Sequence, residues 1–330
     1  MRKLWVLVTA LSISGLAGAA EPPPLVIAEL GDLTFASGEI LRGAKLAYRH
    51  AGKLNADKSN AILFPTWFTG TSEDLFATGS LDAIDTDRFF LIAVDAFGNG
   101  VSSSPSNHPD FPSVTIGDMV AAQHRLVREV FGIERLYAVM GISMGGMQTF
   151  EWIAAYPDFV ERAMPIVGSP RLASYDILLW EAQVEAIELA RQAGDVERAA
   201  ALTGMISALA LQTPRHHARR TPRSHSARFL QMSKQTGSQG MADREVQLRA
   251  MLAHDVSMRF DGSMEKAASV VTARVVNVVA IEDHMVTPAP AIRFAALLGA
   301  ESIELASDCG HLVTGCEVEQ FEEIIGSFLQ

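Results

Sequence analysis

The seven residues 141–147, with the sequence GISMGGM, constrain the fold more than any other feature of this 330-residue chain. They follow a short apolar run, 136–140, with the pattern of a buried strand, and precede a segment, 148–156, with the pattern of a helix. A serine between glycines at such a junction is typical of a tight, strained turn that exposes the hydroxyl as a nucleophile. A side chain at Gly141 or Gly145 would collide with the neighbouring strand or helix. The sequence therefore predicts that Ser143 is presented on a sharp strand-to-helix turn.

Apolar strand patterns alternate with helical patterns along most of the chain. The predicted strands are 26–35, 46–50, 61–64, 89–94, 136–140, 162–167, 275–281 and 302–305, and the helices among them are 115–131, 148–156, 291–298 and 318–328. The first two strands are expected to pair as an antiparallel hairpin. Such alternation favours an α/β fold with a mostly parallel central sheet and helices on both faces. Together with the serine turn, it predicts the α/β-hydrolase fold.

The alternation stops between residues 169 and 268, where three helices are predicted at 177–193, 196–211 and 244–258. About 100 residues of helix between two strands is too long for an ordinary crossover. We therefore expect a helical cap over 171–268, inserted between two parts of the core at 20–170 and 269–330. A cap of this kind covers a pocket and influences which substrates enter it. Its residues Leu178, Leu179 and Trp180 either line that pocket or pack between cap helices.

A basic segment, 215–228, lies inside the predicted cap and contains five arginines and three histidines. It could form an anion site for an acidic substrate or for a cofactor phosphate. Charge runs more often face solvent, which favours a solvated loop between cap helices.

The first 19 residues have the features of a cleavable export signal. Two basic residues precede an apolar stretch, 4–16, and small residues follow at 17–19. An uncleaved membrane anchor is the alternative, but the apolar stretch is shorter than a membrane span. We therefore expect a secreted or periplasmic protein without stable membrane insertion.

Removal of that segment would change the formal net charge from −11 to −13, because the segment carries two basic residues and no acidic one. An acidic surface argues against nucleic acid and against an anionic membrane surface as partners. A small molecule is the expected partner.

A serine nucleophile needs a histidine base and an acid that orients the base, and in α/β-hydrolases they follow in the order Ser, acid, His. Asp283 follows the predicted strand 275–281, and His311 follows the predicted strand 302–305. Because the ends of parallel strands meet at one edge of a sheet, both residues can reach Ser143. Asp283 and His311 are therefore the predicted partners of Ser143.

Three nearby residues compete for these roles. Glu282 lies beside Asp283, Asp308 lies close to His311, and His284 is a second histidine that could act as the base. The chain order and the positions after the strands favour Asp283 and His311.

An ester-cleaving site also needs two backbone N–H groups directed at the developing negative charge. Met144, the residue after the serine, supplies one by position. The loop after the strand 61–64 supplies the other, and we expect the donor to be Phe68. The side chains of Trp67 and Phe68 are also candidates for pocket lining.

The chain has two cysteines, Cys309 and Cys316, on either side of His311. In an exported protein they could form a disulfide, although sequence alone does not give the Cα separation that decides this. Two free thiols are the alternative. A metal site is disfavoured because no second ligand cluster matches them, so no metal and no cofactor are expected.

The chain resembles the homoserine O-acetyltransferase family of α/β-hydrolases from residue 61 to about 187 and again from 248 onward. Residues 141–152, GISMGGMQTFEW, are close to that family's nucleophile motif. Arg171 at the start of the cap, and Asp283 followed by Pro288, look similar to further family segments. The resemblance implies Ser143, Asp283 and His311 as the triad, and Phe68 and Met144 as oxyanion donors. It also implies a homodimer formed through the cap.

Two departures separate this chain from the acetyltransferases. The loop Thr66-Trp67-Phe68 differs from the family's usual sequence, and Leu312 stands where the acetyltransferases place an aspartate that holds the amino group of homoserine. The Thr66-Trp67-Phe68 loop looks like the hydrolase branch of the family, and Leu312 counts against an acetyltransferase. Trp67, Arg171 and Leu312 are therefore candidates for substrate contact.

The sequence thus favours an exported serine hydrolase that cleaves a carboxylic ester through an acyl-serine. The alternative is an O-acyltransferase that moves an acyl group from a CoA thioester to an alcohol. A non-catalytic binding protein on the same scaffold is the third hypothesis, which an intact triad disfavours.

Overall fold

The structure is a computed structural model and describes residues 21–235 and 240–330. The predicted export signal, 1–19, lies outside the described residues. No helix in the described part of the chain is long and apolar enough to cross a membrane.

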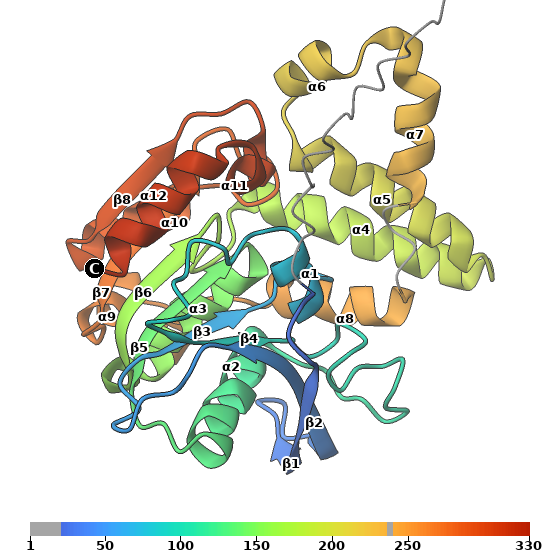
Figure 1. The fold of residues 1–330 in the computed structure, drawn as a ribbon. Coiled ribbons are helices and arrows are strands. Elements are labelled where there is room, and N and C mark those ends of the chain that lie inside the picture. Colours follow the sequence, from blue (N-terminus) through green and yellow to red (C-terminus); the bar gives the residue numbers. More distant parts are fainter. Residues whose placement is uncertain (1–20, 236–239) are drawn as a thin grey trace, which may run out of the picture.

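An eight-stranded sheet forms the centre of the molecule, in the order β1-β2-β4-β3-β5-β6-β7-β8 (Figure 1). Its strands are β1 Val26–Thr34, β2 Ile40–Ala51, β3 Ala61–Pro65, β4 Phe90–Val94, β5 Leu136–Ile142, β6 Val160–Ile166, β7 Arg274–Ala280 and β8 Glu301–Leu305. β1 and β2 form an antiparallel hairpin, β2 pairs antiparallel with β4, and all other pairs are parallel. Every residue of β3 and β4 is buried, as their continuous apolar runs predicted.

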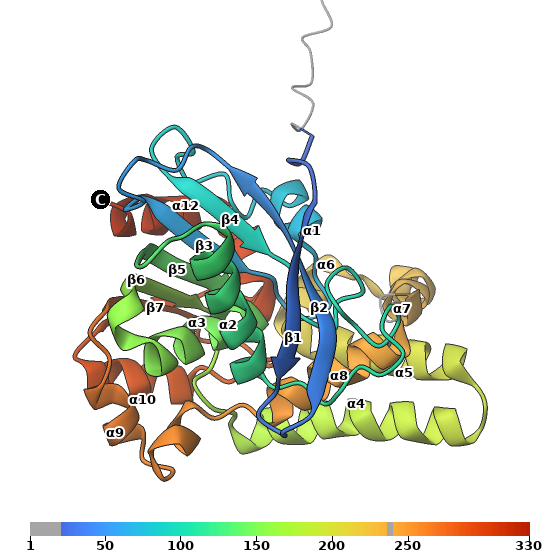
Figure 2. The same ribbon diagram turned by 90° about the horizontal axis from the view of Figure 1, so that it is seen from below.

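Helices cover both faces of this sheet (Figure 2). On one face α2 (Ile116–Arg125), α3 (Met144–Ala155) and α10 (Ala289–Leu298) share an apolar core with strand residues such as Leu63. On the other face α1 (Ser72–Ala77) and α12 (Val318–Phe328) pack against the neighbouring strand residues Ile62 and Phe64. Successive strand side chains therefore enter opposite cores. The predicted α/β-hydrolase fold is confirmed.

The helices between β6 and β7 include a cap that stands beside the sheet (Figure 1). It consists of α4 (Ser174–Gln192), α5 (Val196–Leu211), α6 (Pro214–Arg220), α7 (Ser226–Gln235) and α8 (Met241–Leu252), with the short η3 (Arg223–His225) between α6 and α7. The basic segment is thus largely helical, not the loop that its charge favoured. Thr213 is the N-cap of α6, since its hydroxyl accepts a hydrogen bond from the His216 N–H at 3.0 Å.

The last predicted cap helix, 244–258, is two separate elements. α8 ends at Leu252, and the 3-10 helix η4 (Val256–Phe260) follows. Asp255 interrupts the helix because its backbone bridges to Arg171 and its carboxylate caps η4 by accepting from the Ser257 N–H. η4 packs on α3, and α9 (Met264–Ser269) packs on α10, so both lie against the core.

Candidate active site

The carboxyl ends of β3, β5, β7 and β8 meet at one edge of the sheet, where ligand sites of open α/β sheets form. The loop after β3 carries Phe68, and Ser143 directly follows β5. Asp283 follows β7, and His311 follows β8. The tertiary fold therefore brings together residues that are up to 243 positions apart in the chain.

Ser143 lies on a strained turn between β5 and α3. Its φ and ψ are 59° and −118°, which few non-glycine residues adopt. Hydrogen bonds from the Ser143 N–H to the Ile166 carbonyl (2.8 Å) and from the Met147 N–H to the Ser143 carbonyl (3.0 Å) hold the turn. A Cβ added at Gly141 would lie 2.4 Å from the Gly145 carbonyl oxygen, and one at Gly145 would lie 2.5 Å from the Pro65 oxygen. The turn thus requires both glycines.

Ser143, His311 and Asp283 form a hydrogen-bonded row. Nε2 of His311 lies 2.8 Å from Oγ of Ser143, and Nδ1 of His311 lies 2.7 Å from Oδ2 of Asp283. All three side chains are buried. Because Asp283 accepts the Nδ1–H, the neutral imidazole directs the lone pair of Nε2 at the serine hydroxyl. This geometry allows His311 to take a proton from Ser143.

The loop after β7 fixes the Asp283 carboxylate. Its Oδ1 accepts from the N–H groups of Met285 (2.8 Å) and Val286 (2.9 Å), which leaves Oδ2 for His311. The cap secures the same loop, because the buried Asp176 on α4 accepts from the N–H (2.9 Å) and the hydroxyl (2.6 Å) of Thr287. Burial raises the pKa of the Asp176 carboxyl, although its hydrogen bonds from Thr287 oppose the shift.

The competing acids point elsewhere. Glu282 forms an ion pair of 2.6 Å with Arg215 of α6, and Asp308 pairs with His216 and Arg219 of the same helix. His284 is half-buried and does not line the cavity that contains Ser143.

Met144 directly follows Ser143, and Phe68 of the loop after β3 lines the same cavity as Ser143. Met144 is the first residue of α3, where backbone N–H groups have no partner within the helix. The carbonyl of Thr66 accepts from Nε2 of Gln148 at 3.1 Å, which fixes the loop against α3. Thr69 has a left-handed φ of 62°, and its N–H donates to Oε1 of Gln247 at 2.8 Å. Phe68 lies between these two anchored residues.

A cavity of about 530 Å³ opens beside Ser143 and His311. The core contributes Trp67, Phe68, Met285 and Leu312, and the cap contributes Ser207, Leu211, Gln212 and Arg244. Its wall also includes residues after α1 and residues of α12, among them Gly79, Ala83, Val318 and Phe321. The lining is mostly apolar, so the cavity suits a small molecule with an apolar part.

Of the three residues predicted to contact the substrate, two line the cavity and one does not. Trp67 and Leu312 line the cavity, and 41% of Leu312 is exposed. Arg171 does not line it, because its backbone is held by the bridge to Asp255 at the base of the cap. The cap residues 178–180 do not line it either. Leu178 is exposed, whereas Leu179 and Trp180 pack into the core shared by the cap helices and the sheet.

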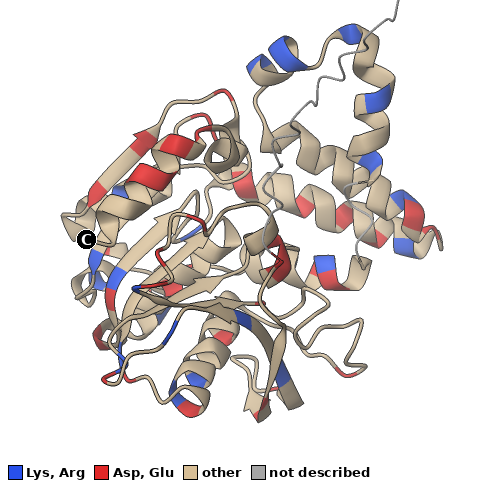
Figure 3. Cartoon of the chain, viewed as in Figure 1, with Lys and Arg blue, Asp and Glu red and all other residues tan. Residues whose placement is uncertain are grey.

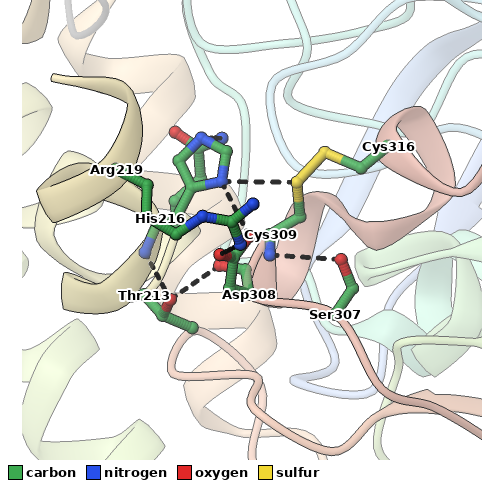
Figure 4. The surroundings of a disulfide bond; sticks show 8 residues. Thr213, His216, Arg219, Ser307, Asp308, Cys309 and Cys316 are labelled. Atoms are coloured by element: carbon green, nitrogen blue, oxygen red, sulfur yellow. Dashed lines mark hydrogen bonds and ion pairs between the residues drawn. A yellow bond between two sulfur atoms is a disulfide. The ribbon is translucent and has the colours of Figure 1, made fainter.

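Cys309 and Cys316 form a disulfide with a Cα–Cα distance of 6.5 Å (Figure 4). The bridge encloses the segment that carries His311, and Cys316 lines the cavity. The disulfide therefore constrains the loop that positions the histidine.

The basic helix α6 contacts the loops that carry Asp283 and His311. Figure 3 shows Lys and Arg along α6 and α7, and Figure 4 shows His216 and Arg219 directed at Asp308. The Thr213 hydroxyl donates to the Asp308 carbonyl at 2.7 Å. Desolvation opposes ionisation of Asp308, but the hydrogen bond to His216 and the charge of Arg219 outweigh it, and the pKa of its carboxyl is lowered. Part of the basic segment thus anchors the cap to the core.

His216, Asp308 and Cys309 place three ligand-type atoms within 4.8 Å of one another, the single such group in the described parts of the chain. They do not suit a metal ion. The Cys309 sulfur is bonded to Cys316, and the Asp308 carboxylate is engaged by Arg219.

Sequence reasoning missed Asp176, Arg244 and Gln247, three buried polar residues of the cap. Arg244 and Gln247 share one face of α8 with the buried Leu248 and Met251. Polar residues at i and i+3 on an apolar face were the available signal.

Comparison with known proteins agrees with this geometry. The family model for the alpha/beta hydrolase fold matches residues 60–314, and the chain belongs to this family. A solved structure titled as an acetylester hydrolase from Corynebacterium glutamicum superposes with a TM-score of 0.85 and 30% identity, covering 93% of this chain and 96% of that one.

Two curated relatives represent the two branches that the sequence suggested. An ethyl acetate hydrolase of Pseudomonas veronii is 45% identical over 172 residues, which cover 50% of this chain and 49% of the relative. A homoserine O-acetyltransferase of Acidiphilium cryptum is 38% identical over 179 residues, which cover 47% of each chain. This chain spans about half the length of the curated relatives it matches. The resemblance to the homoserine O-acetyltransferase-like family and its esterases is confirmed.

Proposed function

We propose that this protein is a serine hydrolase that cleaves carboxylic esters. The observation that carries the proposal is the 2.8 Å separation between Nε2 of His311 and Oγ of Ser143, with Asp283 accepting from the opposite ring nitrogen. The names of its esterase relatives and the mostly apolar cavity support the same class of reaction.

In the proposed reaction, Oγ of Ser143 attacks the ester carbonyl while Nε2 of His311 takes the serine proton. Asp283 stabilises the imidazolium, and the backbone N–H groups of Phe68 and Met144 stabilise the oxyanion. The proton on Nε2 passes to the leaving alcohol oxygen, which leaves an acyl-serine. His311 then takes a proton from the attacking water, the carboxylic acid is released, and the proton returns to Oγ of Ser143.

Hydrolysis of 4-nitrophenyl acetate tests this proposal. We expect Ser143→Ala and His311→Ala each to lower kcat by about 10³-fold or more. The exposed Ser327 and the half-buried His284 provide matched controls, Ser327→Ala and His284→Ala, whose kcat should match the wild type. Wild-type kcat in Ser143→Ala would overturn the assignment.

Acyl transfer to an alcohol is the second candidate function, favoured by the homoserine O-acetyltransferase relatives. It shares the acyl-serine and differs in the group that attacks it. The apolar Leu312 in the cavity wall offers no charge to an amino group of the acceptor. We expect little acetylhomoserine from acetyl-CoA and homoserine, and efficient transfer would favour this second function.

Two further features of the sequence belong to the proposal. The segment 1–19 directs export and is cleaved, which N-terminal sequencing of the protein from the periplasm or medium tests. The cap mediates a homodimer, which light scattering in solution tests. Exposed apolar residues of α4 and α5, including Leu178, Leu189 and Leu209, are available for this contact.

A further inference from the structure

Arg244 is a buried cation in the wall of the cavity that contains Ser143. It lies on α8 of the cap, only 4% of it is exposed, and it is the single Lys or Arg among the lining residues. The one carboxylate residue in the same wall, Glu322, belongs to α12 and is exposed. Within the described lining, the cavity therefore has a buried positive charge and no buried carboxylate.

The groups around Arg244 are neutral. Its Nη2 donates to Oε1 of Gln183 at 3.0 Å and to Oγ of Ser207 at 2.8 Å, and its guanidinium carbon lies 4.8 Å from the centre of the Phe68 ring. Its Nε is buried and has no hydrogen-bond partner among the described residues. No ion pair of Arg244 occurs among residues 21–235 and 240–330.

Other arginines near the cap are compensated. Arg249, five residues further along α8, pairs with Glu245 at 2.8 Å and with Glu188. Arg259 of η4 pairs with Glu151 at 2.6 Å. Arg244 differs because its desolvation is not offset by a carboxylate, and burial lowers its pKa to about 10, which leaves it charged at neutral pH. A buried charge of this kind is costly unless a partner of opposite charge completes it.

We propose that Arg244 binds a carboxylate carried by the ester substrate, so that the enzyme prefers esters with one separate negative charge. The inference deepens the proposed hydrolase function and rests on it. Two kinds of ester have this chemistry: half-esters of dicarboxylic acids, with the charge on the acyl side, and esters of hydroxy acids, with the charge on the alcohol side. A single guanidinium in a mostly apolar cavity matches one carboxylate better than a phosphate, which carries more charge.

Matched ester pairs test the preference on each side of the scissile bond. For the acyl side, 4-nitrophenyl hydrogen succinate is compared with 4-nitrophenyl butyrate. For the alcohol side, 4-acetoxybutanoate is compared with butyl acetate. The readout is the ratio of kcat/KM for the charged ester to that for the neutral ester. We expect the wild-type ratio to exceed about tenfold for one of the two pairs, as for a charge-assisted contact.

Variants of Arg244 then assign the preference to this side chain. We expect Arg244→Met to lower the ratio by about tenfold or more, mainly through a higher KM for the charged ester, and Arg244→Lys to lower it less. Arg249→Met, on the same helix but exposed, is the control and should leave the ratio unchanged. Isothermal titration of succinate into Ser143→Ala should show binding that the additional Arg244→Met substitution removes.

The outcomes separate the two proposals. A wild-type ratio near one for both pairs, or an equal loss for charged and neutral esters in Arg244→Met, would overturn the carboxylate site while leaving ester hydrolysis intact. An equal loss would mean that Arg244 acts only by supporting Phe68. If Arg244→Met does not fold, the wild-type ratios and Arg244→Lys decide. Absence of any Ser143-dependent hydrolysis would instead contradict the proposed function.

Discussion

Gln247 of the cap bridges two loops of the core. Its Oε1 accepts from the Thr69 N–H at 2.8 Å, and its Nε2 donates to the Phe97 carbonyl at 3.0 Å. Thr69 is the neighbour of Phe68, whose N–H is the proposed oxyanion donor. The cap thus contacts the loop that carries the proposed oxyanion donor, and it does so through a fully buried side chain.

Replacing Gln247 with Leu should therefore impair catalysis as well as folding. The substitution leaves the half-buried Thr69 N–H and the buried Phe97 carbonyl without Gln247, and we expect the free energy of unfolding to fall by about 1–3 kcal/mol. A loop displaced by a fraction of an ångström also loses oxyanion contact, so kcat should fall by about tenfold or more while KM changes less. The exposed Gln192→Leu serves as the control. Unfolding and ester kinetics measure both effects, and an unchanged kcat would refute the positioning role of Gln247.

Removing the disulfide should loosen the segment that carries His311. The two bridged cysteines are seven positions apart in the chain. The double variant Cys309→Ala, Cys316→Ala should therefore lower the free energy of unfolding by about 2–3 kcal/mol. We expect kcat for the ester to fall as well, because the histidine is held less firmly. A dithiol reductant should lower the Tm of the wild type and leave that of the double variant unchanged. Identical Tm values for the two proteins would contradict this account.

Stability should fall on mild acidification because of His254. Burial lowers the pKa of this histidine, against the opposing charges of Glu151 and Asp255, and its Nε2 has no hydrogen-bond partner in the part of the chain that the structure describes. A folded-state pKa below the unfolded value of about 6.5 means that the unfolded chain binds the proton more readily. The neutral His254 therefore makes its full contribution to the free energy of unfolding above about pH 6.5. This contribution is lost as the pH falls toward the folded-state pKa, by up to about 1.4 kcal/mol per pH unit.

Substitution of His254 checks this pH dependence. We expect His254→Leu to flatten the dependence of Tm between about pH 7 and pH 5. His225→Leu replaces an exposed histidine of the cap and should retain the wild-type slope. A wild-type slope in His254→Leu would show that another group is responsible.

The contact of α6 with the core should protect the cap from proteolysis. Asp308→Ala removes the acceptor of Arg219 and His216, and we expect trypsin to cleave within 214–235 several times faster, because local opening exposes the arginines there. Asp261→Ala, which removes an exposed pair with Lys266, is the control. Mass spectrometry of the fragments gives the sites and rates. Equal rates for both variants would show that Asp308 does not hold α6.

Patterns within short stretches of sequence predicted the elements of the core correctly. The continuous apolar runs of β3 and β4 are buried on both faces, and the glycines around Ser143 permit a turn that other residues would obstruct. The chain order of Ser143, Asp283 and His311 named three residues that the fold brings into one hydrogen-bonded row.

The same kind of pattern predicted the contacts of the cap residues less well. Its basic segment suggested solvent exposure, yet Arg215, His216 and Arg219 pair with acids that lie more than 60 positions later in the chain. A charge pattern within one segment contains no information about a partner so distant. Arg171, which the family resemblance suggested as a substrate contact, lies outside the cavity.

Periodicity and glycine placement are local properties of the chain, so the amino-acid pattern was enough to predict the α/β-hydrolase fold, the strained serine turn and the order of the residues around it. Three features follow from the three-dimensional packing alone: the bridge between Cys309 and Cys316, the hydrogen bond from the Thr69 N–H to Gln247, and the burial of Arg244 without a carboxylate among the described residues. These features depend on which side chains meet across the interface of cap and core, and long-range packing alone specifies that.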